Sequence, residues 1–274
     1  MSLFTTCYCN YNEPALIESL VKVLNHNGVA TEFLQREHCC GMPKLELGDL
    51  KSVTKLKELN IPIFVDNDAN CMAYAEYRYG AARGCSNVVA LTLGTGIGGG
   101  LIIDGKLYRG SNFAAGELGN FSIDYQGPEN TYGLKGALEC YMGNKQICEL
   151  AEKEFIDMKM PDGGWTPERV TDLALEGNTA AIAIWDQIAD WLASALASTA
   201  WLLNPDAFVV GGGVAKAGHF LFDPLTEKIK NQVSDVISND LKILPAFFGN
   251  ESGMIGSSAQ ALDCWKKENN QTSS

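Results

Sequence analysis

A glycine-rich segment in the middle of the chain is the first candidate for chemistry. The apolar run Val88–Leu93 leads into Gly94-Thr95-Gly96 and then into a second apolar run. Glycines let backbone N–H groups approach a phosphate without side chains in the way, and the Thr95 hydroxyl adds a donor. No Gly-Lys-Ser/Thr follows, which excludes a P-loop, and the next element is a strand, which excludes the dinucleotide fingerprint. A glycine-rich hairpin that merely twists sharply fits the pattern equally well.

Acidic residues form the second group of candidates. Asp66-Asn67-Asp68 lies between a predicted strand and a predicted helix, where a carboxylate can act as general base for a hydroxyl. Helix capping is the commoner use of such residues, and the two roles are compatible. Glu117 and Glu139 each lie beside glycines, where they could accept hydrogen bonds from sugar hydroxyls or remain plain exposed acids. Gly211-Gly212-Gly213 could border a nucleoside or form a tight turn.

The elements that must position these residues indicate an α/β fold, because strands and helices alternate. Asp104-Gly105 between two apolar runs predicts a β-hairpin. The sequence predicts helices over 14–24, 51–59, 69–82 and 180–203, and strands over 30–34, 61–65, 88–93, 106–108 and 207–210. A further strand is expected after the glycine run 94–100, ending at Ile103.

Composition and charge exclude several classes of protein. The net charge of −12 opposes a nucleic-acid partner held by phosphate contacts. The longest uncharged apolar stretch, Trp191–Leu203, is shorter than the roughly 20 residues that a membrane span needs, so we expect a buried helix and no membrane partner. No segment resembles a signal peptide, and nine cysteines do not suggest a disulfide framework. We therefore expect a cytoplasmic protein with its cysteines reduced, buried or bound to metal.

Taken in order, the motifs after residue 55 resemble the ROK family of sugar kinases and repressors, which have the actin-like ATPase (ribonuclease H-like) fold. The resemblance covers residues 56–264. The matching segments are Val65-Asp66-Asn67-Asp68-Ala69-Asn70, residues 91–100, Gly116-Glu117-Leu118-Gly119, Leu203-Asn204-Pro205-Asp206 and Gly211-Gly212-Gly213-Val214.

The resemblance implies ATP-dependent phosphorylation of a hexose of the glucose or N-acetylmannosamine type. Asp68 would be the base that takes the proton from the attacking sugar hydroxyl. The other sugar-binding residues would be Asn67, Glu117, Asn120 and Glu139, and the ATP-binding residues would be Gly94, Thr95, Gly96, Gly211, Gly212 and Gly213. The expected cofactors are ATP and Mg²⁺, and a homodimer is common in such proteins. Phosphoryl transfer depends mostly on positioning and charge stabilisation, which fits these residue types.

Two departures from the family pattern concern metal and phosphate binding. The family holds a structural zinc through a His and a Cys-x-Cys-Gly-x-x-Gly-Cys cluster, and the corresponding positions here are Asn120, Asn130, Tyr132 and Ala137. None of these is a good zinc ligand, so we expect no structural zinc and no other metal site. The Asp-x-Gly-Gly-Thr phosphate loop of the family is absent, so the body is expected to be N-terminally incomplete.

Residues 2–53 resemble instead the cysteine-rich domain of iron–sulfur oxidoreductase subunits, of the anaerobic glycerol-3-phosphate dehydrogenase or heterodisulfide reductase type. The segment that carries this resemblance is Cys39-Cys40-Gly41-Met42-Pro43, but the Cys-x-x-Cys pair that should follow is missing. We therefore expect a foreign α/β segment over 1–54, a kinase body over 55–268 and a flexible tail over 269–274. Three other hypotheses are a sugar-binding protein without catalysis, a fused gene fragment, and a redox partner built on the N-terminal cysteines.

Overall fold

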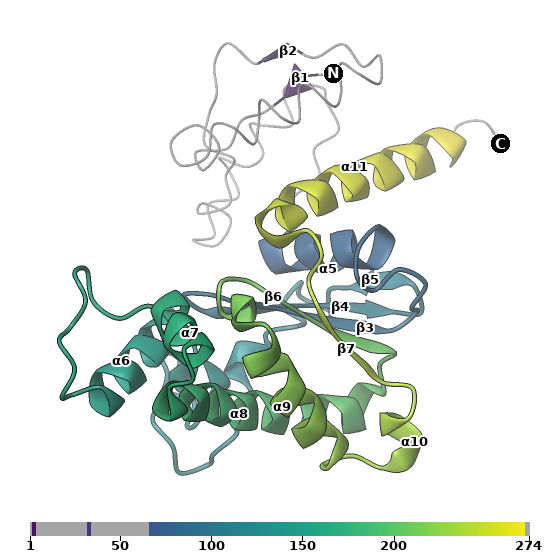
Figure 1. The fold of residues 1–274 in the computed structure, drawn as a ribbon. Coiled ribbons are helices and arrows are strands. Elements are labelled where there is room, and N and C mark those ends of the chain that lie inside the picture. The colour runs from purple at the N-terminus through teal and green to yellow at the C-terminus, as the bar shows by residue number, and fades with distance from the viewer. Residues whose placement is uncertain (1, 4–31, 34–65, 272–274) are drawn as a thin grey trace. The chain divides into compact units, whose positions relative to one another are not determined.

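The computed structural model describes residues 2–3, 32–33 and 66–271 (Figure 1). The chain divides into one unit of Met1–Val65 with Trp265–Ser274, and a second unit of Asp66–Cys264. In the first, strands β1 (Ser2–Leu3) and β2 (Glu32–Phe33) pair in parallel, and β2 lies within the strand expected over 30–34. The other elements expected before residue 66, and the cysteines of the iron–sulfur resemblance, lie outside the described residues.

The second unit is built on a five-stranded mixed sheet with the order β5-β4-β3-β6-β7. Its strands are β3 (Val88–Leu93), β4 (Ile97–Ile103), β5 (Lys106–Tyr108), β6 (Ala207–Gly211) and β7 (Lys242–Pro245). The meander β3-β4-β5 is antiparallel, whereas β6 runs parallel to β3 and β7 parallel to β6. Asp104 and Gly105 both have positive φ, which is the turn that an Asp-Gly hairpin requires, so the predicted hairpin is confirmed.

Helices cover both faces of this sheet (Figure 1). The face bearing α5 (Asp68–Arg78) also carries α11 (Ser252–Gln271), which packs on α5 through Gly256 against Cys71. The opposite face carries α8 (Thr179–Leu203) and α9 (His219–Lys230). The remaining helices are α6 (Asn144–Glu154), α7 (Pro167–Leu175), α10 (Asp235–Ser238) and the 3-10 turns η2 (Leu118–Asn120), η3 (Leu138–Cys140), η4 (Val214–Ala217) and η5 (Gly249–Glu251).

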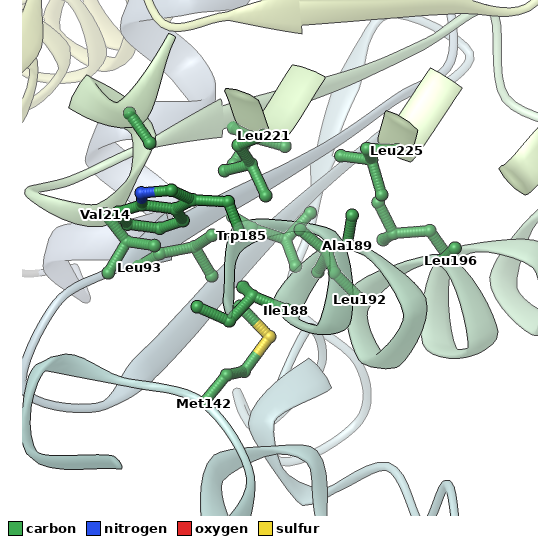
Figure 2. Close-up of a cluster of buried hydrophobic side chains, with 14 of the residues drawn as sticks. Leu93, Met142, Trp185, Ile188, Ala189, Leu192, Leu196, Val214, Leu221 and Leu225 are labelled. Atoms are coloured by element: carbon green, nitrogen blue, oxygen red, sulfur yellow. The ribbon is translucent and has the colours of Figure 1, made fainter. Parts of the chain in front are cut away.

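The larger core lies between the sheet and α8 (Figure 2). Trp185, Ile188 and Leu192 of α8 are fully buried there and belong to the same cluster as Leu93 of β3 and Leu221 of α9. The residues of β3 alternate between this core and a smaller one under α5, because successive side chains of a strand point to opposite faces. Burial on both faces explains why β3 and β6 are continuous apolar runs.

The structure corrects one predicted boundary and one predicted burial. Helix α5 ends at Arg78 instead of residue 82, because the buried carboxylate of Glu76 accepts the backbone N–H of Ala81 and turns the chain out of the helix. The end of α8 is not buried as expected: Trp201 and Leu202 are exposed, and the Trp201 indole donates to the carbonyl of Gln232.

Helix α11 extends through Gln271. Residues 269–271, which were expected to belong to a flexible tail, are therefore part of this helix. No helix in the described part of the chain is long and apolar enough to cross a membrane.

Candidate functional site

The turn that precedes α5 contains two of the expected site residues, Asn67 and Asp68. The Asn67 side chain accepts a hydrogen bond from the N–H of Ala69 at 2.8 Å and is the N-cap of α5. Asp68 follows the N-cap as the first residue of the helix. It is exposed, and only its Oδ1 accepts a hydrogen bond from a described residue, the N–H of Ala69 at 2.8 Å. The arrangement leaves Asp68 with an oxygen that can accept a proton.

An ion pair anchors this turn. The Arg109 Nη2 lies 2.6 Å from Oδ2 of Asp66, and Nε donates to the same oxygen at 3.0 Å. Oδ1 of Asp66 accepts from the N–H of Asn67 and from Nδ2 of Asn70. The Arg109 guanidinium also donates to Oε1 of Gln260 at 2.9 Å, which connects α11 to the turn. Neither Arg109 nor Gln260 was predicted from the sequence, since no local pattern marks a residue for a contact 43 or 151 positions away.

The glycines of β4 bring α5 and the Glu117 loop to the same strand. A Cβ atom on Gly100 would lie 2.7 Å from the Cβ of Ala73, so α5 packs directly on this residue. A Cβ atom on Gly99 would overlap the carbonyl oxygen of Gly116. Because alternate residues of a strand face opposite sides, the start of α5 and the Glu117 loop pack on opposite faces of one short segment.

Three acids, Asp68, Glu117 and Glu139, interact electrostatically next to this segment of β4. Partial burial raises the pKa of Glu117, and the negative charges of Asp68 and Glu139 raise it further. Coulombic coupling of this kind requires the carboxylates to be near one another. The three come from α5, the loop before η2 and η3, so the structure brings together the acids expected from the sequence. An acid whose pKa is raised by acids from other elements, as that of Glu117 is, is typical of functional sites.

Asn120 and Glu139 are joined through a residue that sequence analysis considered only as a zinc position. Nδ2 of Asn130 donates to Oδ1 of Asn120 and to Oε1 of Glu139, each at 2.9 Å. Asn130 is thus the link between two of the expected sugar-binding residues.

The two glycine segments meet at the end of the sheet where β3 and β6 finish. Gly211 pairs with Thr92 across the sheet, and Gly212 has a φ of +90° and lies so close to Leu93 that a Cβ would overlap its carbonyl oxygen. At Gly94 and Gly96 a Cβ would meet no atom within 4 Å, so the loop between β3 and β4 is open on that side. Ligands of α/β sheets bind at the carboxyl ends of parallel strands, which is where these glycines lie.

Helix α6 begins against the same loop. The N–H of Asn144 donates to the carbonyl of Gly94 at 2.9 Å, and a Cβ on Gly143 would lie 3.4 Å from the carbonyl oxygens of Gly94 and Thr95. Among the described residues, the side-chain oxygens of Asn144 and Gln146 are buried without a hydrogen-bond partner. The start of α6 was not among the candidate residues from the sequence. No local sequence pattern marks Asn144 and Gln146 as residues whose side-chain oxygens are buried without a partner.

The residues at the expected zinc positions do not fit the metal. Ala137 has no donor atom, the Tyr132 side chain is 78% exposed, and Asn120 and Asn130 are bonded to each other. Zinc in proteins takes thiolate, imidazole or carboxylate ligands, none of which is present at these four positions. Within residues 66–271 no group of three His, Cys, Asp or Glu side chains could hold a metal ion.

Comparison with known proteins gives a family match over most of the chain. A family model described as "ROK family" matches residues 35–263, so the match begins inside the segment 1–54 that sequence analysis set apart. The chain is 32% identical over 224 residues to a glucokinase of Streptomyces coelicolor, covering 75% of this chain and 68% of the relative. It is 31% identical over 205 residues to a glucokinase of Thermotoga maritima, covering 72% and 65%. The chain thus spans about two thirds of the length of these relatives.

A xylose repressor of Bacillus spizizenii is also similar, with 26% identity over 215 residues, covering 78% of this chain and 54% of the repressor. Among solved structures, the ROK hexokinase of Thermus thermophilus is 30% identical with a TM-score of 0.66, covering 76% of this chain and 67% of that one. A ROK glucokinase of Streptomyces griseus in complex with glucose and AMPPNP shares the fold, with a TM-score of 0.69 at 24% identity, covering 91% and 88%.

Proposed function

The chain belongs to the ROK family, and from this premise we propose that it transfers the γ-phosphoryl group of ATP to a hydroxyl of a hexose of the glucose or N-acetylmannosamine type. Two observations support the proposal: α5 and the Glu117 loop pack on neighbouring glycines of β4, and the charges of Asp68 and Glu139 raise the pKa of Glu117. Several carboxylates in one place suit a ligand with several hydroxyl donors. The family supplies the reaction, because glucokinases are among the relatives.

Asp68 is the general base in this proposal. The sugar hydroxyl gives its proton to the Asp68 carboxylate while its oxygen attacks the γ-phosphorus. The bond from that phosphorus to the bridging oxygen breaks, and ADP leaves with the electron pair. Asp68 is suited to the role because its carboxylate is exposed and its Oδ2 accepts no hydrogen bond within the described part of the chain.

The remaining residues bind and orient the reactants. Glu117 and Glu139 accept hydrogen bonds from sugar hydroxyls, and the side-chain amides of Asn67 and Asn120 donate to them. The open side of Gly94-Thr95-Gly96 admits phosphate oxygens to backbone N–H groups, and Gly211-Gly212-Gly213 borders the nucleoside. Mg²⁺ neutralises charge on the phosphates and would arrive bound to them, because proteins seldom build an all-protein cage for this ion.

The test is an ATP-coupled phosphorylation assay on the full chain with a panel of hexoses. Asp68→Asn keeps the shape of the side chain and removes the base, so we expect kcat to fall at least 100-fold, the lower end for a general base. Asp235→Asn is the control, because Asp235 is likewise an exposed first residue of a helix, α10. ADP formation that is independent of sugar, or equal in wild type and Asp68→Asn, would refute the assignment.

The second candidate is a sugar-binding protein without catalysis. It is favoured by the absence of an Asp-x-Gly-Gly-Thr segment from the 274 residues and by the similarity to xylose repressors. Calorimetry separates the two functions: sugar uptake with no ADP formed in the assay supports the binding protein.

A further inference from the structure

Asn130 is bonded through every hydrogen-bonding position of its side chain. The two hydrogens of Nδ2 are donated to Asn120 and Glu139, at 2.9 Å each. Oδ1 accepts the backbone N–H groups of Tyr132 and Leu134, both at 3.0 Å. A primary amide offers two donor hydrogens and two acceptor lone pairs, so the side chain is saturated.

This pattern admits only one orientation of the Asn130 amide. A flipped amide would point its oxygen at Oδ1 of Asn120 and Oε1 of Glu139, which are both acceptors. Its NH₂ group would then face two backbone N–H groups, which are both donors. Four favourable contacts would become four unfavourable ones, so the contacts themselves determine which atom faces the site.

The orientation of Asn130 decides what its two partners present to a ligand. Oδ1 of Asn120 is occupied, so its Nδ2 remains as a donor. Oε1 of Glu139 is occupied, so Oε2 remains as an acceptor. Within the described part of the chain neither remaining atom has a hydrogen bond. Nδ2 of Asn120 is thus a donor and Oε2 of Glu139 an acceptor, on two side chains that are both bonded to Nδ2 of Asn130. Such a pair complements two neighbouring hydroxyl groups, each of which can donate and accept.

Asn130 belongs to a loop whose two sides are joined by backbone hydrogen bonds. Isolated bridges join Ser122 to Ala137 and Glu129 to Lys135. The N–H of Leu138 donates to the carbonyl of Phe121 at 2.8 Å, and the N–H of Asn130 donates to the carbonyl of Leu134 at 2.9 Å. These contacts bring both ends of the loop together next to η3, which carries Glu139.

We propose that Asn130 is a positioning residue that holds Asn120 with its donor and Glu139 with its acceptor toward the sugar, in the loop where the family pattern would place zinc. The inference rests on the proposed function, because it assigns an orientation to residues proposed there to bind sugar. Asn130 itself does not touch the sugar.

Asn130→Asp separates this role from loop closure. The introduced carboxylate still accepts the N–H groups of Tyr132 and Leu134, so the loop keeps those bonds. Its second oxygen, however, faces the acceptors of Asn120 and Glu139. We expect the sugar dissociation constant, measured by calorimetry on the full chain with glucose and N-acetylmannosamine, to rise about 10-fold or more, since polar partners are lost. The KM for ATP should stay near the wild-type value.

The pH dependence distinguishes positioning from simple damage. At acidic pH a proton shared between the introduced carboxyl and Glu139 restores a donor, so the ratio of variant to wild-type dissociation constants should fall as pH decreases. Glu117 and Cys140 are the other titratable groups coupled to Glu139, and both remain in the variant. Asn178→Asp is the control, because Asn178 caps α8 through an oxygen that aspartate retains.

One result would overturn the inference alone, and another would overturn it together with the proposed function. Sugar affinity unchanged in Asn130→Asp, or lowered by the same factor at every pH, would remove the positioning role while leaving the kinase proposal intact. If wild type binds no sugar, the ¹³C carboxyl titration of Glu139 in the free protein gives the second readout. A Glu139 titration that shifts in Asn130→Asp would then confirm the contact between residue 130 and Glu139. The absence of sugar binding would overturn both the kinase proposal and the sugar-positioning role.

Discussion

The guanidinium of Arg109 and the carboxylate of Asp66 meet at 2.6 Å at the base of the turn that starts α5. The Asp66 side chain is 10% exposed and that of Arg109 31%, so the pair is largely withdrawn from water. Asp68 lies two residues further along the same turn. The ion pair therefore connects the end of the β4-β5 hairpin to the position of the proposed base.

Removing Arg109 should affect both stability and catalysis. Arg109→Ala leaves a nearly buried carboxylate without its cation, which should cost about 2 kcal/mol of unfolding free energy in a urea titration. We expect kcat to fall as well, because the turn that carries Asp68 loses its anchor. Lys145→Ala is the control: its ion pair with Glu149 is exposed on α6 and should contribute less than about 0.5 kcal/mol. Equal losses in the two variants would show that the buried pair has no special role.

Gly99→Ala tests the close packing on β4. The added Cβ would overlap the carbonyl oxygen of Gly116 and press on Leu118, so the Glu117 loop must move. We expect a loss of about 2 kcal/mol in unfolding free energy, in the range for overpacked sites, together with weaker sugar binding. Gly253→Ala in the first turn of α11 meets no atom within 4 Å and should stabilise the helix by up to about 1 kcal/mol. A neutral Gly99→Ala would contradict the packing argument.

The raised pKa of Glu117 makes a prediction about pH. The folded state binds its proton more tightly than the unfolded state does, so stability falls as pH rises from the ordinary value of 4.5 through the raised one. Glu117→Gln removes this titration, and its stability relative to wild type should therefore increase from acid to neutral pH. Because Asp68 and Glu139 contribute through charge, salt should reduce the difference.

Urea unfolding at several pH values measures this effect, with the exposed Glu176→Gln at the end of α7 as control. A stability difference that is constant across pH would contradict the prediction. Sugar affinity should fall in Glu117→Gln but not in the control.

Metal analysis tests the prediction that the loop over residues 120–139 needs no zinc. We expect no stoichiometric zinc in the purified chain and no change in melting temperature on adding a zinc chelator, because the four positions offer no zinc ligands. One zinc per chain that is lost in Asn120→Ala would contradict this reading.

Local pattern was sufficient for the elements that lie close in sequence. The strands 88–93 and 106–108 have the predicted bounds, and the strand between them ends at Ile103 as predicted, because alternation, β-branching and an Asp-Gly turn act over a few residues. The start of that strand at Ile97, inside the glycine run, was not predicted. The long α8 was predicted from its composition within one residue of its start. The end of α5 at Arg78 was not predicted. The spacing of apolar residues continues to residue 82, but the Glu76 carboxylate accepts the backbone N–H of Ala81 and ends the helix earlier.

For the site, the sequence by itself determined which acids and glycines were candidates, and through their order it indicated the family. It could not show which of them meet, since that depends on contacts between elements far apart in the chain. Only the tertiary structure decided that Asn67 and not Asp68 caps α5, that Arg109 pairs with Asp66, and that the glycines of β4 are packing surfaces on both faces. It also decided the part played by Asn130, whose four hydrogen bonds exist only once the loop has closed. Hydrogen bonds and ion pairs act over about 3 Å of space, whatever the separation in sequence, and the fold sets that distance.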